Sequence, residues 1–359
     1  MAVLIVLAVV VGLIALRFAL PAGTPSIRRV AGAGSGATIA SLEKVRIGGC
    51  DQWILMRSED VANPLILFVH GGPGTSELTL NRRNTRGLEK SFLVVNWDQR
   101  GAGKSYAALC DAGRMRIDQF VEDTRELTQY LLKRFNQRKL VLVGHSWGTV
   151  VGSLAVSRYP QLYSCYVGIG QVGNMEECEA ASYRWTLEQA RAAGHRQAIR
   201  ALERMGPPPY QGDWQSAMLT QRRYLGRFGG ECHGSRIGAF GLVLGSVVFS
   251  REYTLADRFN FFRGIFQSQR ALWHEVQRVD LFRSVRELAV PVFFMEGRFD
   301  HEAPAEVAAR YFEALVAPSK ELIWFERSAH LPNAEERDLF NRMMVEKVLP
   351  IAADPPVPG

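Results

Sequence analysis

The chain has 359 residues, of which 47% are hydrophobic and 22% are charged, and its formal net charge is +7. This composition excludes an intrinsically disordered chain, which would lack the apolar side chains needed to offset chain entropy. The basic residues are scattered and form no long run, so we expect no nucleic-acid partner. The five cysteines form no C-x-x-C pair, so we expect no zinc site. The length suits one large domain that carries an insert.

Residues 2–16 form an unbroken apolar run, which Arg17 interrupts. Extended to residue 20, the run reaches the minimum of about 17 residues for a membrane-spanning helix. No Lys or Arg precedes the run, and no clear A-x-A cleavage site follows it. We therefore expect an uncleaved single-pass membrane anchor over residues 1–20 rather than a signal peptide, with its orientation left open.

The segment over residues 21–40 is rich in Ala, Gly, Ser, Thr and Pro, which predicts a linker. From about residue 41, short apolar runs alternate with amphipathic stretches such as residues 117–135. The apolar runs cover residues 65–69, 92–95, 140–143, 165–169, 290–294 and 322–325. Such runs suit strands buried on both faces, so the alternation predicts an α/β fold with a mostly parallel sheet and helices on both faces.

The alternation breaks over residues 171–288, where the pattern is mostly helical. Asn174 can cap a long helix that ends before Gly194, and Glu177 completes a capping-box pattern three residues after the cap. We therefore expect a helical cap over residues 171–288. It would be inserted between a first core part at residues 41–170 and a second core part at residues 289–350.

Residues 144–148 have the sequence Gly-His-Ser-Trp-Gly and lie between a predicted strand and a predicted helix. This is the G-x-S-x-G pattern in the strand–turn–helix context that exposes a serine hydroxyl above a sheet. Ser146 is therefore the candidate nucleophile. The backbone N–H of Trp147, the next residue, is a candidate donor to a developing oxyanion.

The predicted strand at residues 65–69 ends in His-Gly-Gly-Pro-Gly at residues 70–74. Acyl transfer uses two backbone N–H groups aimed at the oxyanion, and the second comes from the loop after an earlier strand. We assign it to Gly72, with Gly71 as the alternative. A phosphate-binding loop is disfavoured, because the G-x-x-x-x-G-K-[ST] spacing is absent.

The acid and the base of such a site follow the serine in the order acid, then histidine. Asp300 comes just after the predicted strand at residues 290–294 and is the first candidate acid, while Glu296 is the second. His330 lies beyond the last predicted strand. We expect His330 to act as the base and Asp300 to orient it.

Together these residues resemble the α/β-hydrolase superfamily and, within it, the prolyl iminopeptidase group of serine peptidases. The resemblance rests on residues 70–74 and 144–148, and on Asn-Trp-Asp-Gln-Arg-Gly-Ala-Gly-Lys-Ser at residues 96–105. It implies an α/β-hydrolase fold with an inserted cap, a triad on the three residues named above, and no metal ion or cofactor. It also implies aminopeptidase-like release of the amino-terminal residue from small peptides.

The resemblance further implies that acidic cap residues hold the free amine of the substrate. The acids in the comparable place are Glu176, Glu177 and Glu179. Residues 182–188, however, lack the W-x-x-W-E signature of the group. The residues that bind substrate are therefore left unassigned.

Two other functions fit the sequence. A membrane-tethered esterase or amidase for an apolar substrate would use the aromatic residues of the cap, which are Trp185, Phe261, Phe262 and Trp273. A non-catalytic binding protein could keep the same fold, but an intact triad argues against it. Epoxide hydrolases and dehalogenases share the fold, but they need a carboxylate nucleophile where Ser146 stands.

Overall fold

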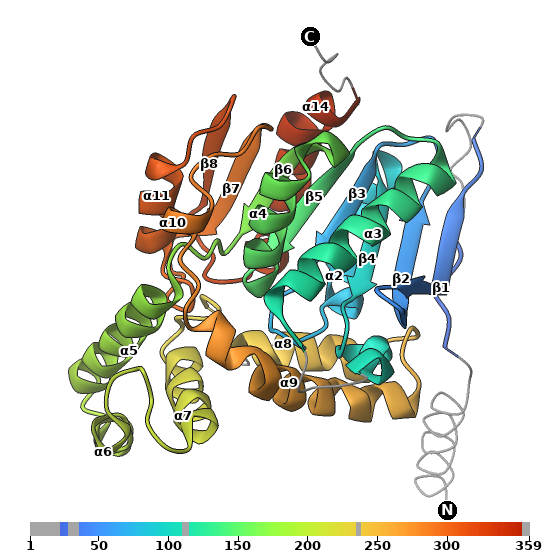
Figure 1. Ribbon diagram of the computed structural model, residues 1–359. Helices are drawn as coiled ribbons and strands as arrows, with labels where there is room; N and C mark the ends of the chain where they lie inside the picture. The colour runs from blue at the N-terminus through green and yellow to red at the C-terminus, as the bar shows by residue number, and fades with distance from the viewer. Residues whose placement is uncertain (1–21, 28–35, 110–114, 235–237, 354–359) are drawn as a thin grey trace, which may run out of the picture.

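The computed structural model describes residues 22–27, 36–109, 115–234 and 238–353, and within them eight strands form one sheet (Figure 1). The strand order is β1-β2-β4-β3-β5-β6-β7-β8. The β1–β2 and β2–β4 pairs are antiparallel, and the other pairs are parallel. The strands are β1 Ile39–Ile47, β2 Cys50–Ser58, β3 Leu65–Val69, β4 Leu93–Asp98, β5 Leu140–His145, β6 Tyr163–Ile169, β7 Val292–Gly297 and β8 Lys320–Phe325.

Helices connect the strands and cover both faces of the sheet. The helices are α2 Leu78–Asn84, α3 Ile117–Phe135, α4 Trp147–Arg158, α5 Met175–Ala192, α6 Arg196–Met205, α7 Trp214–Arg227, α8 Gly238–Val248, α9 Leu255–Val276, α10 Leu281–Ser284, α11 Ala305–Ala314, α12 Pro332–Glu335, α13 Arg337–Met343 and α14 Leu349–Ala353. Short turns of other helix types are η1 Arg86–Lys90, η2 Gly103–Leu109, η4 Pro160–Leu162 and η5 Met344–Val348.

The predicted α/β fold is confirmed, and the six predicted strands correspond to β3 to β8. The amphipathic stretch 117–135 matches α3 from end to end. The predicted cap of α5 is also present, because the side chain of Asn174 accepts a hydrogen bond from the backbone N–H of Glu177 at 3.0 Å.

The segment expected to be a linker is partly built into the fold. β1 begins at Ile39, inside the range 21–40, and pairs along its whole length with β2. Nearer the amino terminus, the guanidinium of Arg57 in β2 donates to Thr24 Oγ1 at 2.7 Å and to the carbonyl of Pro25 at 2.6 Å. These polar contacts hold the segment against the fold, and composition alone does not reveal them.

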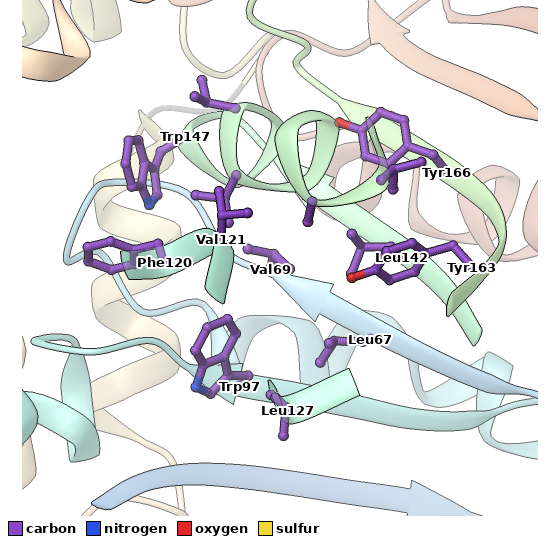
Figure 2. Close-up of a cluster of buried hydrophobic side chains, with 14 of the residues drawn as sticks. Leu67, Val69, Trp97, Phe120, Val121, Leu127, Leu142, Trp147, Tyr163 and Tyr166 are labelled. Carbon is purple, nitrogen blue, oxygen red and sulfur yellow. The ribbon is translucent and has the colours of Figure 1, made fainter. Parts of the chain in front are cut away.

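The main hydrophobic core lies between the sheet and the helices α3 and α4 (Figure 2). Phe120 of α3 packs edge-on against Trp147 of α4, with 5.5 Å between ring centroids. Trp97 of β4 and Tyr166 of β6 are almost fully buried in the same core. Each fully buried large apolar side chain stabilises the fold by about 1.5–3 kcal/mol. The core therefore fixes the strand ends from which the candidate site residues extend.

The helices α5 to α9, between β6 and β7, lie together beyond the carboxyl ends of the parallel strands (Figure 1). This group packs on the loops that follow the strands. Lys104 of η2 binds Asp257 of α9 with 2.7 Å between Nζ and Oδ2. These helices thus cover the strand ends at which Ser146 is found. The boundaries of a cap domain remain a prediction.

The predicted membrane location is wrong for the part of the chain that the structure describes, where none of the helices is long and apolar enough to cross a bilayer. Even α9, with 22 residues, carries charged side chains such as Asp257, Arg263 and Arg270. Residues 1–20, on which the prediction rested, lie outside the described residues.

Candidate active site

Ser146 occupies the sharp turn between β5 and α4, with backbone angles of φ 52° and ψ −119°. A non-glycine residue with positive φ is strained by about 1–3 kcal/mol, and such strain persists only where packing enforces it. The packing here is tight. A Cβ atom on Gly144 would lie 2.5 Å from the carbonyl oxygen of Gly148, and one on Gly148 would lie 2.0 Å from that of Val69. The two glycines of the motif therefore let α4 approach β3 and β5 closely enough to force the turn.

His330 and Asp300 meet where β8 and β7 end. The Nδ1 atom of His330 lies 2.7 Å from Oδ2 of Asp300, and both side chains are buried. The other oxygen of Asp300 accepts from the backbone N–H groups of Glu302 and Ala303 at 2.9 and 3.0 Å. The alternative acid, Glu296, instead accepts from the backbone N–H of Gln171 at 2.9 Å. Of the two candidates, only Asp300 therefore contacts the imidazole.

Burial opposes protonation of His330, but the negative charges of Asp300 and Glu302 outweigh it and raise the pKa of His330 above its ordinary value. The Nε2 atom lies 3.9 Å from Oε2 of Glu302. Within the described ranges, no hydrogen bond joins Nε2 to the hydroxyl of Ser146. His330 is nonetheless in contact with the residue that precedes Ser146, because its carbonyl oxygen lies 2.9 Å from Nε2 of His145. The His330 ring lies 4.8 Å from the ring of His145, the residue before Ser146, measured between centroids.

Of the two candidate oxyanion donors, Trp147 directly follows Ser146 and Gly72 lies in the loop after β3. Neither the N–H of Gly72 nor that of Trp147 has a hydrogen-bond acceptor among the described residues, so both can serve a ligand. The alternative donor, Gly71, directs its N–H to Oε1 of Glu77 at 3.2 Å. A Cβ atom on Gly71 would lie 3.3 Å from that of Ser146, so this loop passes directly beside the serine.

Gln99 ties the three motif segments together. Its side-chain amide donates to the carbonyl of His70 at 2.7 Å and accepts from Nε1 of Trp147 at 3.1 Å. Its backbone N–H donates to Nε2 of His70 at 3.1 Å. His70 must then carry its proton on Nδ1, which faces the carbonyl of Gly71 at 2.7 Å. Burial lowers the pKa of His70, in keeping with this neutral form.

Acidic residues from two different segments border His330. Glu302 follows Asp300 in the chain, and Glu231 comes from the loop after α7, where its carbonyl accepts from the backbone N–H of His330 at 3.1 Å. Arg222 of α7 links Glu302, at 3.6 Å, to the buried Glu179 of α5. Burial and the charge of Glu302 raise the pKa of Glu231 to about 8.

Sequence reasoning missed Glu231 and Glu302. Glu302 lies only two residues after Asp300, and this spacing was an available signal. Glu231 follows Gly229-Gly230 in a segment without periodicity, so no pattern marked it.

The acidic and aromatic residues proposed from the sequence lie in different places. Glu177 is an exposed partner of Arg310, whereas Glu176 and Glu179 line a cavity of about 240 Å³. Phe261 is fully buried in a core cluster. The other aromatic residues are Trp185, which stacks on His301 at 4.0 Å, Trp273, which stacks on Trp214 at 5.4 Å, and Phe262, which is 37% exposed. Of these aromatic residues, Trp185 is the one in contact with the segment that carries Asp300.

Across residues 22–27, 36–109, 115–234 and 238–353, no three His, Cys, Asp or Glu side chains are placed to hold a metal ion. The groups at the site are a hydroxyl, an imidazole, carboxylates and backbone N–H donors.

A family model described as the alpha/beta hydrolase fold matches residues 64–336, which include all of the candidate site. The chain belongs to this family. It is also 36% identical over 303 residues to a probable aminopeptidase of Bacillus subtilis strain 168, covering 84% of this chain and 94% of that protein. These similarities establish the coarse class of the chain as a hydrolase of this fold.

Solved structures agree with this fold. The proline iminopeptidase-related protein of Thermus thermophilus has a TM-score of 0.58 and 18% identity, with 87% of this chain and 99% of that chain covered. The proline iminopeptidase of Mycobacterium smegmatis has a TM-score of 0.55 and 16% identity, with the same coverage of both chains. The predicted similarity to this group is confirmed.

Proposed function

We propose that this hydrolase uses Ser146 as its nucleophile and releases the amino-terminal residue of small peptides. The observation that carries the proposal is the buried Asp300–His330 pair, which lies next to a strained serine turn and is bordered by carboxylates. The name of the relative from Bacillus subtilis, a probable aminopeptidase, supports the same activity.

In this mechanism the hydroxyl of Ser146 attacks the carbonyl carbon of the first peptide bond while Nε2 of His330 takes the hydroxyl proton. The N–H groups of Gly72 and Trp147 bind the oxyanion, and each such donor contributes roughly 2.7–4 kcal/mol to lowering the barrier. His330 then gives its proton to the leaving amine. A water molecule hydrolyses the acyl-enzyme by the same route, and Asp300 holds the imidazole in place throughout.

The restriction to the amino-terminal residue is assigned to Glu302 and Glu231. The α-amino nitrogen of a peptide is two bonds from the first carbonyl carbon, so a substrate seated on Ser146 places its ammonium close to His330. A carboxylate of Glu302 already lies 3.9 Å from the imidazole there. Opposite charges at such a buried place attract strongly, and an ammonium without a partner carboxylate would be costly to bury.

A panel of prolyl, alanyl and other aminoacyl arylamides tests the activity, with N-acetylated versions of the same compounds as matched controls. We expect turnover of the free-amine arylamides and much weaker turnover of the acetylated ones. Hydrolysis of simple esters together with silence on every arylamide would instead favour an esterase and reject the aminopeptidase proposal.

Covalent labelling tests the nucleophile separately. We expect a fluorophosphonate probe to label the wild-type protein and to leave the Ser146→Ala variant unlabelled. Ser153→Ala is a matched control, because Ser153 is a buried serine of α4 outside the proposed reaction. No labelling of a folded wild-type protein would favour a non-catalytic binding protein.

A further inference from the structure

A second histidine–carboxylate pair lies beside the candidate site, formed by Glu77 and His145. The Nδ1 atom of His145 is 2.6 Å from Oε1 of Glu77, and the two side chains are only 6% and 3% exposed. His145 ends β5, while Glu77 directly precedes the short helix α2, which follows the His-Gly-Gly-Pro-Gly loop. The mechanism proposed above gives neither residue a role.

The hydrogen bonds of His145 define its protonation. Its Nε2 atom lies 2.9 Å from the backbone carbonyl oxygen of His330, and its Nδ1 atom faces the Glu77 carboxyl group. A carbonyl oxygen and a carboxylate only accept hydrogen bonds, so both ring nitrogens must donate, which a neutral imidazole cannot do. Burial favours a neutral Glu77, but the charge and hydrogen bond of His145 outweigh it and lower the pKa of Glu77. The two residues therefore form an ion pair.

The pair joins the three segments that carry the proposed reaction. Glu77 accepts from the N–H of Gly71, which precedes the oxyanion donor Gly72. His145 directly precedes Ser146 and binds the backbone of His330. Loss of the pair would release the oxyanion loop and the base from each other, and a displacement of about 1 Å at such a site can cost about 100-fold in rate.

The charge of His145 also acts on His330. The ionisable groups that face His330 are the carboxyl groups of Asp300, Glu302, Glu231, Glu296 and Glu77 and the imidazolium of His145, while His70 lies beside the pair. Burial raises the pKa of Glu231 and of Glu296, so the negative charges that raise the pKa of His330 are those of Asp300, Glu302 and Glu77. Carboxylates favour a protonated His330, whereas a like charge at a ring distance of 4.8 Å favours the neutral form. Only the neutral form can take the proton of Ser146.

We propose that Glu77 and His145 are positioning residues, which hold the oxyanion loop against the base, and that the charge of His145 favours the neutral form of His330. This proposal rests on the proposed function. It adds to that function a second ionised pair, which does not touch the substrate.

The test compares Glu77→Gln and His145→Gln with the wild type on a simple ester, which has no ammonium for Glu231 and Glu302. We expect kcat to fall by about 10- to 100-fold with little change in KM. We also expect the acid limb of the kcat/KM profile to move to higher pH in His145→Gln, because Glu77 then keeps its negative charge without the neighbouring cation. In Glu77→Gln the limb should move less, because a negative charge that raises the pKa of His330 is lost together with the positive charge of His145.

Glu89→Gln is the matched control, because it breaks another buried ion pair, with Arg57 at 2.7 Å, in a different part of the fold. We expect this control to lose stability and to keep the acid limb of the wild type. If the folded Glu77 and His145 variants keep both the wild-type kcat and the wild-type acid limb, the proposal is wrong.

A readout without turnover separates the two proposals. Nitrogen NMR of histidine-labelled Ser146→Ala protein at about pH 7 should show His145 protonated on both ring nitrogens, and adding Glu77→Gln should remove one of these protons. A single proton on His145 in the Ser146→Ala protein would overturn the ion pair. Absence of Ser146-dependent labelling in the wild type would overturn the proposed function instead, and the NMR result would still decide the pair.

Discussion

Asp300 and His330 lie 30 residues apart in the chain, and 2.7 Å separates Oδ2 of the one from Nδ1 of the other. Both oxygens of Asp300 are occupied, one by the imidazole and one by two backbone N–H groups. The carboxylate therefore cannot rotate without losing hydrogen bonds, and it presents a fixed acceptor to the ring. This arrangement favours the tautomer of His330 whose Nε2 is free to accept a proton.

Replacing Asp300 by Asn should lower kcat by about 10³- to 10⁴-fold, because an amide can present a donor to Nδ1 and favour the wrong tautomer. Steady-state kinetics on an arylamide or an ester measure the effect. Asp213→Asn, at the exposed cap of α7, is the control and should keep the wild-type rate. A loss smaller than about tenfold in Asp300→Asn would rule out the orienting role.

The rate should depend on pH through His330. Because neighbouring carboxylates raise its pKa, kcat/KM should increase with pH through an acid limb that lies above pH 6.5. Glu302→Gln removes one of these charges, so its acid limb should move to lower pH. Pre-steady-state or steady-state profiles on a simple ester measure this, with Glu306→Gln, an exposed neighbour, as control. An unmoved limb in Glu302→Gln would contradict the assigned cause.

Stability should fall with rising pH because of Glu231. The carboxyl ionises with a pKa of about 8 in the fold and near 4.5 in the unfolded chain, so the fold holds its proton more tightly. The stabilisation is complete below pH 4.5 and is lost as pH rises through 8. At about pH 9, Glu231→Gln should exceed the wild type in free energy of unfolding by on the order of 1 kcal/mol. Chemical denaturation at about pH 5 and pH 9 measures the free energy of unfolding of both proteins. If it changes equally with pH in the wild type and in Glu231→Gln, the role assigned to Glu231 is wrong.

The serine turn should fail when α4 is pushed away from β3. A Cβ atom on Gly148 would lie 2.0 Å from a backbone oxygen, so Gly148→Ala should destabilise the fold by roughly 1–3 kcal/mol and lower kcat. Gly245→Ala is the matched helical control, since a Cβ atom there meets nothing within 4 Å. It should stabilise the fold by about 0.5–1 kcal/mol. Thermal unfolding measures the change in stability of each variant. Similar changes in Gly148→Ala and Gly245→Ala would show that close packing at Gly148 does not matter.

Sequence reasoning worked best where a local pattern and a buried strand coincide. The run Leu65–Val69 is apolar at every position because the strand is covered on both faces, and it matches β3 at both ends. Asn174 could be predicted as a cap because one side chain and one nearby N–H define the motif. β1 and β2 were not predicted from the sequence. β1 is a partly exposed edge strand, and β2 carries polar residues that are nonetheless buried, such as Gln52 and Arg57, so neither shows a clear apolar run.

The candidate site likewise has residues that the sequence predicts and residues that it does not. Asp300 and His330 follow strand ends, and the order of the elements is enough to place them at one edge of the sheet. The sequence ranks Asp300 ahead of Glu296 by position alone, whereas the contact with the imidazole, which separates the two, is a tertiary one that no local pattern contains. Glu231 could not be found at all, since it comes from a loop whose position depends on how the helices between β6 and β7 pack.

The hydrogen bonds of Gln99 have a practical consequence for protein engineering. One amide side chain and its own backbone serve His70 and Trp147 together, so three loops from separate parts of the chain behave as a single mechanical unit. Replacing any one of these loops by that of a homologous enzyme would break the hydrogen bonds that Gln99 makes to the others. Attempts to retune selectivity should therefore diversify the surrounding helices and leave this unit untouched.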